Sequence, residues 1–392
     1  MTADVPGDPQ RTRPTLYLAP HRWDGQRQRA HHLAAGLARS RPVLFVEPAA
    51  HSFPGTVRRR LAGEAPPRPG LRRISDGLAV YAPVPTLPWS LSSRPLNRAV
   101  HYLTWRGLQA TLDALRWPAV DVLVGWPPAF DLARLAAPRR LVYDCLDLFP
   151  AFETGRRRWL LERLETQLSR AASEVVVTSN ALERRWRERH ARVLRIPNAV
   201  EWDLFGRGGD SHTGPGDLDG LKRPRLGYVG TLGPWTDLPL LTTVARQRPD
   251  VSIVLVGPAE RGVAPPTDVP NLRWLGQRPY ASLPAYLASM DVLLVPFRLM
   301  DLTHAVNPIK FYEYCATGKP IVATPLEELT RFPELCHLGE GTQAFLSAVD
   351  AAVAEAAAPD PRRVAARRQF ASANTWDHRV QAFARLLDEP TL

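Results

Sequence analysis

The chain has 392 residues, of which 45% are hydrophobic and 23% are charged, so its composition is that of a globular protein and not of a disordered one. This length is enough for two domains that each bury a core of their own. The three cysteines, Cys145, Cys315 and Cys336, are widely separated and odd in number, which excludes a disulfide framework and a zinc-ligand spacing and favours a reducing compartment.

The formal net charge of +11 predicts a negatively charged partner, but it does not choose between nucleic acid, an anionic membrane and a phosphate-bearing substrate. No apolar run approaches the roughly 18 to 20 residues that a membrane-spanning helix needs. The first residues, which include Asp4 and Asp8, do not have the pattern of a signal peptide. We therefore expect a cytoplasmic protein.

The first half of the chain alternates predicted strands and helices. Residues 1–14 lack periodicity and are expected to form a disordered tail. A strand over 15–19, a helix over 26–39 capped by Asp24 and Gly25, and a strand over 42–47 form a βαβ unit, which predicts a parallel sheet. No G-x-G-x-x-G follows the first strand, so a dinucleotide-dependent dehydrogenase is not indicated.

Two further features of this half bear on its structure and surface. Strands are predicted over 120–125, 141–145 and 174–178, with a helix over 157–172 whose core stripe is Trp159, Leu160, Leu164 and Leu168. A basic stretch over 51–73, followed by a segment with Trp, Tyr, Leu and Arg over 88–105, could rest on an anionic membrane. The alternative is a solvated loop beside an ordinary core helix.

Residues 206–224 are rich in Gly, Asp and Pro and predict a linker between two domains. The linker holds Asp217 and Asp219 in a D-x-D pattern, but two carboxylates in a linker are expected to be solvated, and we assign them no metal. Strands follow over 226–229, 252–256, 271–275 and 292–295, and residues 342–388 are predicted to be mostly helical.

Residues 307–320 (NPIKFYEYCATGKP) predict a short helix that begins with a cap at Asn307 and ends at Gly318. Lys310 and Glu313 share a face with Tyr314 and Thr317, and we expect this face to bind while Phe311, Tyr312 and Cys315 pack. A lysine in the first turn of a helix suits a phosphate group, and the carboxylate one turn later suits sugar or ribose hydroxyls. The alternative is a solvated ion pair between Lys310 and Glu313.

This stretch resembles the donor-binding signature of GT-B glycosyltransferases, especially family 4, which reads roughly P-x-K-x-x-E-Y-x-A-x-G-K-P. The segments V-Y-D-x-x-D at 142–147 and I-P-N-A-V at 196–200 also resemble this family, with Ala199 and Glu201 as departures. The resemblance implies an α/β fold with two Rossmann-like parallel-sheet domains that face a cleft. Its domains would be an acceptor domain over 15–205, a linker over 206–224, a donor domain over 225–373 and a C-terminal helix over 374–392 that crosses back to the first domain.

The resemblance also implies a set of site residues. For the general base we favour Asp147 over Asp144, since an inverting enzyme needs a base near the acceptor hydroxyl. Two departures stand out: Ala305 replaces the first Glu of the family's E-x7-E motif, and Trp235 and its neighbours replace an Arg/Lys pair near the diphosphate. The expected donor-binding residues are Gly230, Thr231, Gly233, Arg278, Tyr280, Asn307, Lys310 and Glu313, and the acceptor-side residues are His21, Asp24 and Gly25.

The resemblance implies a metal-independent hexosyltransferase without a cofactor, which uses a nucleotide diphosphate-sugar donor, and we expect UDP in preference to GDP. We expect the acceptor to be a glycan or a lipid-linked glycan in surface polysaccharide assembly, with the protein on the inner face of the membrane. A non-catalytic nucleotide-sugar-binding or scaffolding protein remains the alternative. A nucleic-acid partner is not expected, because no nucleic-acid-binding module is present.

Overall fold

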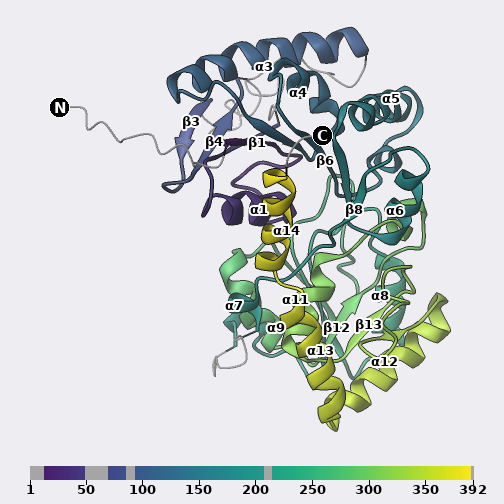
Figure 1. Ribbon diagram of the computed structural model, residues 1–392. Coiled ribbons are helices and arrows are strands. Elements are labelled where there is room, and N and C mark those ends of the chain that lie inside the picture. Colours follow the sequence, from purple (N-terminus) through teal and green to yellow (C-terminus); the bar gives the residue numbers. More distant parts are fainter. Residues whose placement is uncertain (1–12, 49–68, 85–92, 207–213, 390–392) are drawn as a thin grey trace. The chain divides into compact units, whose positions relative to one another are not determined.

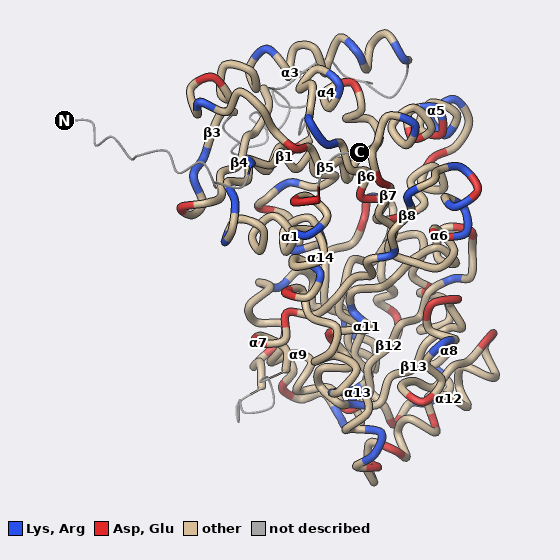
Figure 2. Tube along the Cα trace, viewed as in Figure 1, with Lys and Arg blue, Asp and Glu red and all other residues tan. Residues whose placement is uncertain are grey.

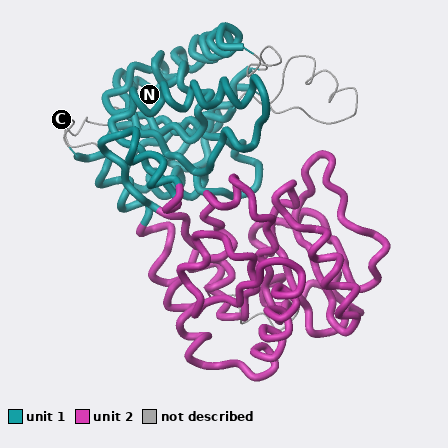
Figure 3. Tube along the Cα trace, turned by 90° about the vertical axis from the view of Figure 1, so that its right-hand side faces the viewer, with its two compact units in different colours: residues 1–178, 182–196, 379–392 teal, residues 179–181, 197–378 magenta. Residues whose placement is uncertain are grey.

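A computed structural model describes residues 13–48, 69–84, 93–206 and 214–389. The chain divides into two compact units (Figure 3): residues 1–178, 182–196 and 379–392 form the first, and residues 179–181 and 197–378 form the second. The predicted tail up to residue 12, most of the basic stretch over 51–73, and residues 207–213 of the linker lie outside the described residues.

The first unit is built on one sheet, which in the described part of the chain has the strand order β3-β4-β2-β1-β5-β6-β7-β8 (Figure 1). All neighbours pair in parallel except β3, which runs antiparallel to β4. The central strands are buried along their whole length and mostly apolar, apart from Asp144 in β6 and Glu174 in β7, as expected when helices cover both faces of a parallel sheet. The strands are β1 (Thr15–Leu18), β2 (Val43–Val46), β3 (Gly70–Arg73), β4 (Leu78–Ala82), β5 (Asp121–Val124), β6 (Leu141–Cys145), β7 (Glu174–Val177) and β8 (Val193–Arg195).

The helices of the first unit correct two predictions. The first helix begins at Arg29 after Gln28, not after Asp24 and Gly25, because the Gln28 amide donates to His31 Nδ1 and so begins the first turn there. In α5 (Gly155–Ala171) the side chain of Trp159 is 57% exposed and so lies outside the buried stripe. Leu161 is buried in this helix instead. The helices are α1 (Arg29–Leu37), α3 (Arg94–Ala114), α4 (Phe130–Leu135), α5 (Gly155–Ala171), α6 (Asn180–Arg187), which begins in the second unit, and α14 (Trp376–Asp388), whose residues from Arg379 on belong here.

Helix α14 packs against α1 in the core of the first unit (Figure 1). Val380 and Phe383 share one apolar cluster with Leu33 and Leu37 of α1. The contact is so close that a Cβ atom added at Gly36 would lie 2.2 Å from Val380 Cγ2. The end of α14 is held by the buried Arg140, which donates to the Leu386 carbonyl oxygen at 2.6 Å.

The second unit has a sheet with the order β11-β10-β9-β12-β13-β14 in its described part, and all its strands are parallel. Its core is continuous from the sheet to the helices on both faces. The strands are β9 (Arg225–Val229), β10 (Ser252–Val256), β11 (Leu272–Gly276), β12 (Val292–Val295), β13 (Ile321–Ala323) and β14 (His337–Leu338). The helices are α7 (Trp202–Phe205), α8 (Leu238–Gln247), α9 (Leu283–Ala288), α10 (Asp301–His304), α11 (Ile309–Thr317), α12 (Gly341–Ala357) and α13 (Pro361–Ala373).

Each sheet has one point at which the strand order reverses. In the first unit this point lies between β1 and β5, and in the second it lies between β9 and β12. Open parallel sheets bind ligands beyond the carboxyl ends of their strands at such a reversal. The loops that follow these four strands are therefore the expected positions of a binding site. Among the described residues, no helix combines the length and apolar character needed to cross a bilayer.

Candidate functional site

Helix α11 follows the predicted signature, but its cap differs from the prediction. The helix runs from Ile309 to Thr317 and ends at Gly318, whose φ of 77° is the expected left-handed conformation. Its N-cap position is Pro308, which has no side-chain hydrogen bond to offer. The prediction that Asn307 caps the helix is therefore wrong, because its side chain is used elsewhere.

Asn307 ties the start of α11 to a segment more than a hundred residues earlier. Its Oδ1 accepts from the Asn198 amide at 2.9 Å, and its carbonyl oxygen accepts from Asn198 Nδ2 at 2.6 Å. Its Nδ2 donates to the Tyr312 hydroxyl and to Glu328 Oε2. The residue is buried and fully engaged, so its observed role is to position the helix. Asn198 and Glu328 are site-supporting residues that sequence reasoning missed, although the I-P-N-A-V segment contains the first of them.

The two faces of α11 are also less distinct than predicted. Tyr314 was expected on the binding face, but it is fully buried, and its hydroxyl accepts from the Val229 amide at 2.8 Å. The helix therefore packs on the end of β9 through Tyr314. Lys310 and Glu313 remain at the edge of this contact, next to the loop that follows β9.

The ammonium group of Lys310 lies over aromatic rings at the reversal point of the second sheet. Its Nζ is 4.6 Å from the ring centroid of Phe297, which follows β12, and 5.2 Å from that of Tyr228 in β9. Within the part of the chain that the structure describes, no carboxylate lies within ion-pair distance of this ammonium and no acceptor hydrogen-bonds it. A cation with unsatisfied donors in a partly desolvated position is costly unless an anion joins it.

The turn after β9 is shaped around the Lys310 side chain. Gly230 has φ of 153°, a conformation that favours glycine, and a Cβ atom there would lie 2.8 Å from Lys310 Cε, so the lysine side chain runs directly past this turn. The Tyr228 hydroxyl donates to the Thr231 carbonyl oxygen at 2.7 Å, and the Gly233 amide donates to Thr236 Oγ1 at 3.3 Å. Gly230, Thr231 and Lys310 thus come together as predicted from the parallel-sheet rule, and Gly233 closes the same turn.

Burial shifts the pKa values of both ionisable groups on this face of α11. It lowers the pKa of Lys310 to about 8, although the Glu313 carboxylate acts in the opposite direction. It raises the pKa of Glu313 to about 7, which Lys310 opposes and Glu201 reinforces. Neither group is the fully solvated ion that an ordinary surface pair would be. Added negative charge near Lys310 would therefore stabilise its protonated form.

Arg278 and Tyr280, two other predicted donor-binding residues, lie beyond β11 and are engaged in structural contacts. Arg278 donates to Asp217 Oδ2 at 2.7 Å and to the Tyr286 hydroxyl at 2.8 Å. The expectation that Asp217 is merely solvated is wrong, because this ion pair holds it. The Tyr280 ring packs edge-on against Phe205 at 5.6 Å. Contacts of Arg278 and Tyr280 with a donor remain predictions.

In the first unit, Asp144 is a buried structural charge. Both carboxylate oxygens accept from Arg29 Nε, at 3.0 and 3.1 Å, and Asp144 Oδ2 also accepts from the Tyr17 hydroxyl. With its oxygens occupied and its side chain fully buried, Asp144 is not placed to take a proton from an acceptor. The role of Arg29 was not predicted from the sequence, because no local pattern indicates an ion-pair partner more than a hundred residues away.

Asp147 is placed differently, in the turn that follows β6. Its carbonyl oxygen accepts from the Phe149 amide at 3.0 Å, which forms the turn. Its carboxylate makes no hydrogen bond to any described residue, and desolvation raises its pKa to about 7. A carboxylate with a pKa near neutrality can act as a general base at physiological pH. This geometry agrees with our preference for Asp147 over Asp144.

The acceptor-side candidates lie in the loop between β1 and α1. Asp24 accepts from both terminal nitrogens of Arg72 in an exposed ion pair, at 3.1 and 2.9 Å, while Gly25 forms a tight turn with its amide donating to the Arg22 carbonyl oxygen. His21 is exposed in the same loop. Glu47 holds this loop in place, because its Oε1 accepts from the Trp23 amide at 2.9 Å. Glu47 was not predicted.

No group of three His, Cys, Asp or Glu side chains among the described residues is arranged to hold a metal ion. The D-x-D pair was assigned no metal from the sequence, and Asp217 instead pairs with Arg278. Ala305, at the position of the missing glutamate, is buried, and its carbonyl oxygen accepts from the Ser179 hydroxyl at 2.6 Å.

Residues 223–358, which form most of the second unit, match the family model of the glycosyl transferases group 1. TuaH of Bacillus subtilis, a glycosyltransferase named for teichuronic acid biosynthesis, is 27% identical over 220 residues, which are 52% of this chain and 55% of that protein. The chain thus spans about half the length of this relative. A GDP-mannose-dependent alpha-mannosyltransferase of Mycolicibacterium smegmatis is 28% identical over 330 residues, 79% of this chain and 82% of that protein.

The fold is that of a solved enzyme structure. The sucrose-phosphate synthase of Thermosynechococcus elongatus superposes with a TM-score of 0.72, covering 95% of this chain and 98% of that one at 15% identity. The two parallel-sheet Rossmann-like units thus define a protein with the GT-B fold. Its second unit matches the glycosyl transferases group 1 over residues 223–358.

Proposed function

We propose that the protein is a metal-independent glycosyltransferase that moves a hexose from a nucleotide diphosphate-sugar to an acceptor hydroxyl. The observation that carries this proposal is the Lys310 ammonium, which lies between two aromatic rings at the reversal point of the family-matched unit without an anionic partner among the described residues. A diphosphate would supply that missing charge. The Gly230 turn lies against Lys310, so the same diphosphate would border this turn.

Glycosyl transfer leaves negative charge on the departing nucleoside diphosphate. Lys310 would stabilise this charge without a metal ion, because it interacts more strongly in a desolvated site than in water. Glu313, one turn further along α11, would accept hydrogen bonds from hydroxyls of the donor. Asp147 in the first unit would take the proton of the acceptor hydroxyl. No cofactor is needed, since the nucleotide-sugar is itself a substrate.

We propose UDP in preference to GDP as the nucleotide, and a glycan or lipid-linked glycan of a surface polysaccharide as the acceptor. The name of TuaH, which refers to teichuronic acid biosynthesis, supports the second part. The name of the M. smegmatis relative specifies GDP-mannose, so both nucleotides need to be compared directly. We propose that the net positive charge of the protein attracts these phosphate-bearing substrates and an anionic membrane. We propose no nucleic-acid partner.

An assay of nucleoside diphosphate release tests the proposed function. UDP-, GDP- and TDP-sugars are incubated with the purified protein, with and without a lipid-linked glycan, and the released diphosphate is measured. We expect release from one class of donor, with UDP-sugars preferred, and stimulation by the glycan. Release that is absent for every donor, with and without glycan, would contradict the proposal. The Lys310→Met variant is the control for contaminating activity.

Exposed aromatic and basic side chains of the first unit support a cytoplasmic location on the inner face of an anionic membrane. On α3, Tyr102 and Leu103 are 50% and 51% exposed, and Arg98 lies on the same helix. On α5, Arg163 lies over the exposed ring of Trp159 at 5.3 Å. Figure 2 shows basic residues along both helices. Exposed apolar side chains on helices that also carry arginines are suited to an anionic bilayer surface.

Vesicle sedimentation tests this location. Binding should require phosphatidylglycerol in phosphatidylcholine vesicles and should decrease with added salt. The double substitution Tyr102→Ser and Leu103→Ser should weaken binding, whereas Leu194→Ser, an exposed leucine on β8, should not. Binding that ignores lipid charge and salt would exclude an anionic membrane as the partner.

A non-catalytic nucleotide-sugar-binding or scaffolding protein is favoured by one specific observation. The first glutamate of the E-x7-E motif is replaced by Ala305, a buried residue with no side-chain group that could contact a donor sugar. In that case nucleotides should bind in calorimetry while no donor is turned over. The release assay therefore separates the two functions when it is combined with a binding measurement on the same protein.

A further inference from the structure

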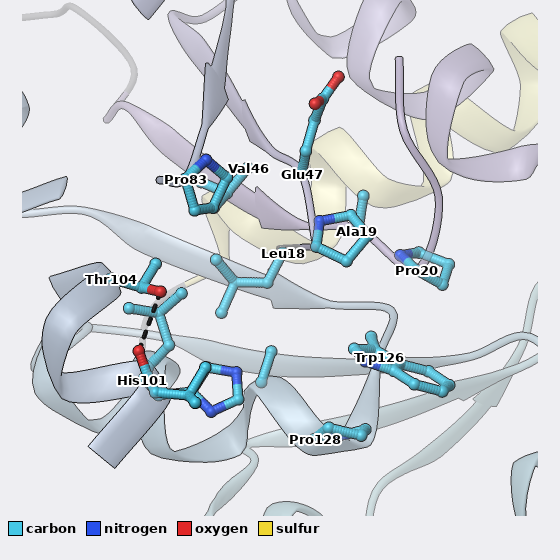
Figure 4. A pocket seen from close by; sticks show the side chains of 14 residues that line it. Leu18, Ala19, Pro20, Val46, Glu47, Pro83, His101, Thr104, Trp126 and Pro128 are labelled. Carbon is cyan, nitrogen blue, oxygen red and sulfur yellow. Dashed lines mark hydrogen bonds between the residues drawn. The ribbon is translucent and has the colours of Figure 1, made fainter. Parts of the chain in front are cut away.

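The first unit contains a cavity of about 230 Å³ that none of the predicted site residues lines (Figure 4). Its walls come from the residues that follow β1, β2, β4 and β5 and from one face of α3. The loops after β1 and β5 flank the reversal point of this sheet, where parallel sheets bind ligands. The cavity therefore occupies the binding position of the first unit, as Lys310 does in the second.

The cavity is unsuited to a phosphate or a carboxylate. The chain has 50 Lys and Arg residues, yet none of the described residues that line the cavity is one of them. Its one carboxylate, that of Glu47, accepts from the Trp23 amide and points away from His101 in Figure 4. Most other lining groups are apolar. A ligand here would be uncharged, and it would be small, since cavities for drug-sized molecules measure roughly 300 to 1,000 Å³.

His101 brings a ring nitrogen that can accept a hydrogen bond to the wall of the cavity. Its Nδ1 lies 2.9 Å from the Asn97 carbonyl oxygen, and because a carbonyl can only accept, Nδ1 carries the proton. Burial lowers the pKa of His101, so the ring is neutral near pH 7. Nε2 is then a hydrogen-bond acceptor, and no described residue donates to it. The ring is fixed because Asn97, one turn earlier, donates to the Pro128 carbonyl oxygen and to Asp131.

An aromatic wall complements this acceptor. Trp126 lines the cavity from the loop after β5, and its ring is held edge-on against Phe149 at 5.2 Å. Pro20 and Pro128 add rigid apolar surface on the same side of Figure 4. Flat apolar walls with one fixed acceptor suit a saturated ring that has C–H groups on its faces and hydroxyl groups on its edge.

We propose that this cavity binds an uncharged, hydroxyl-bearing sugar ring of the acceptor, with one ring hydroxyl donating to His101 Nε2 and the ring faces packing against Trp126. This inference rests on the proposed function, because it identifies the ring as part of a glycosyl acceptor. It assigns His101 a role in acceptor binding and specificity. It also implies that any phosphate of the acceptor lies outside the cavity.

Binding of small neutral glycosides to the full chain tests the proposal. Saturation-transfer NMR is recorded with methyl α-mannopyranoside, methyl α-glucopyranoside and N-acetylglucosamine, and with mannose 6-phosphate as the charged counterpart. At least one neutral probe should bind saturably and should shift the ¹⁵N resonance of His101 Nε2, while mannose 6-phosphate should bind at least fivefold more weakly. Equal or tighter binding of the phosphate, or no binding of any neutral probe, would overturn the proposal.

Three variants on α3 separate recognition from folding. His101→Phe keeps a ring but removes the acceptor, and it should weaken glycoside binding at least fivefold. His101→Gln places an amide oxygen near the Nε2 position and should stay within twofold of the unaltered protein. Thr111→Val, further along the same helix and outside the cavity lining, removes a hydroxyl that donates to the Gly107 carbonyl oxygen, and it should also stay within twofold. Unchanged binding in His101→Phe, or equal losses in Thr111→Val and His101→Phe, would exclude His101 as the acceptor.

Nucleotide calorimetry on the same proteins distinguishes this inference from the proposed function. UDP and GDP affinities should be the same in His101→Phe as in the unaltered protein, which also shows that the variant is folded. If neutral glycosides bind but no nucleotide does, the glycosyltransferase proposal fails and the cavity assignment stands. If nucleotides bind but neutral glycosides do not, only the cavity assignment fails.

Discussion

The Nζ atom of Lys310 in α11 lies 4.6 Å from the centroid of the ring of Phe297, which lies just after the end of β12. The aromatic face stabilises the ammonium, by roughly 0.5 to 2 kcal/mol, but it provides no hydrogen-bond acceptor for the N–H donors of the group. A carboxylate in the place of Phe297 would have neutralised the charge and removed its affinity for an anion. The ring holds the lysine in position and keeps it available to a diphosphate.

Replacing Lys310 by Met should weaken UDP or GDP binding at least tenfold, about 1.4 kcal/mol, in isothermal titration calorimetry. The protein should not lose stability, because methionine fills the same space without a desolvated charge. Lys319→Met is the matched control: that ammonium donates to the Ala288 carbonyl oxygen at 2.7 Å, so its loss should lower stability and leave nucleotide affinity unchanged. Unchanged affinity in Lys310→Met would exclude the phosphate role.

The stability effect of Lys310→Met should depend on pH in a defined direction. The folded-state pKa of Lys310 is about 8, below its usual value of 10.5, so between these values the unfolded chain binds more protons and stability rises with pH. The cost of the buried lysine is fully present below pH 8 and is lost above about pH 10.5. The variant should therefore gain melting temperature at pH 7 and match the unaltered protein near pH 10.5. A variant that melts lower at pH 7 would contradict this.

Asp147→Asn should abolish sugar transfer while nucleotide affinity is retained. The pKa of Asp147 is about 7, raised by desolvation, and a general base must be unprotonated, so kcat/KM should fall as pH decreases through 7 in the unaltered protein. Asp76→Asn, at a fully exposed carboxylate of the same unit, is the control and should keep full activity. Substantial transfer by Asp147→Asn would remove this residue from the mechanism.

Asp144→Asn should destabilise the first unit strongly, by about 3 to 5 kcal/mol, since it leaves the buried Arg29 charge without its partner. Tyr17→Phe removes one hydrogen bond to the same carboxylate and should cost only about 0.5 to 1.5 kcal/mol. Urea unfolding, with hydrogen exchange to locate the loss in β1 and β6, measures both. Combining Asp144→Asn with Arg29→Met should recover part of the stability. Equal costs for the two single substitutions would mean that the charge pair is not the source.

Gly36→Ala should loosen α14 from α1, because the added methyl group would lie 2.2 Å from Val380 Cγ2. The substitution should lower the melting temperature and increase hydrogen exchange in α14. Val380→Ala alone removes apolar contacts and should also destabilise, but the double variant should be more stable than the sum of the two effects predicts. Strict additivity would show that the two residues are not in contact.

The local elements of this protein were predictable from its sequence. Buried parallel strands are continuous apolar runs, so β6, β10 and β12 were predicted with the bounds that the structure has. The signature around Lys310 predicted both a helix and its left-handed end at Gly318, because those features depend on a few neighbouring residues. The match of the second unit to the glycosyl transferases group 1 was also predictable, since the motif lies in one continuous stretch within residues 223–358.

The tertiary structure decided which polar residues are free to act and which are structural partners. Asp144 and Asp147 are three residues apart in one motif, yet only Asp144 pairs with Arg29. The Asn307 side chain binds Asn198 and does not cap α11. The cavity beside His101 is formed by segments after four strands and by α3, so no local pattern marks it. Hydrogen bonds and cavities of this kind join residues that are far apart in the chain, and only packing of the sheet and its helices determines which of them meet.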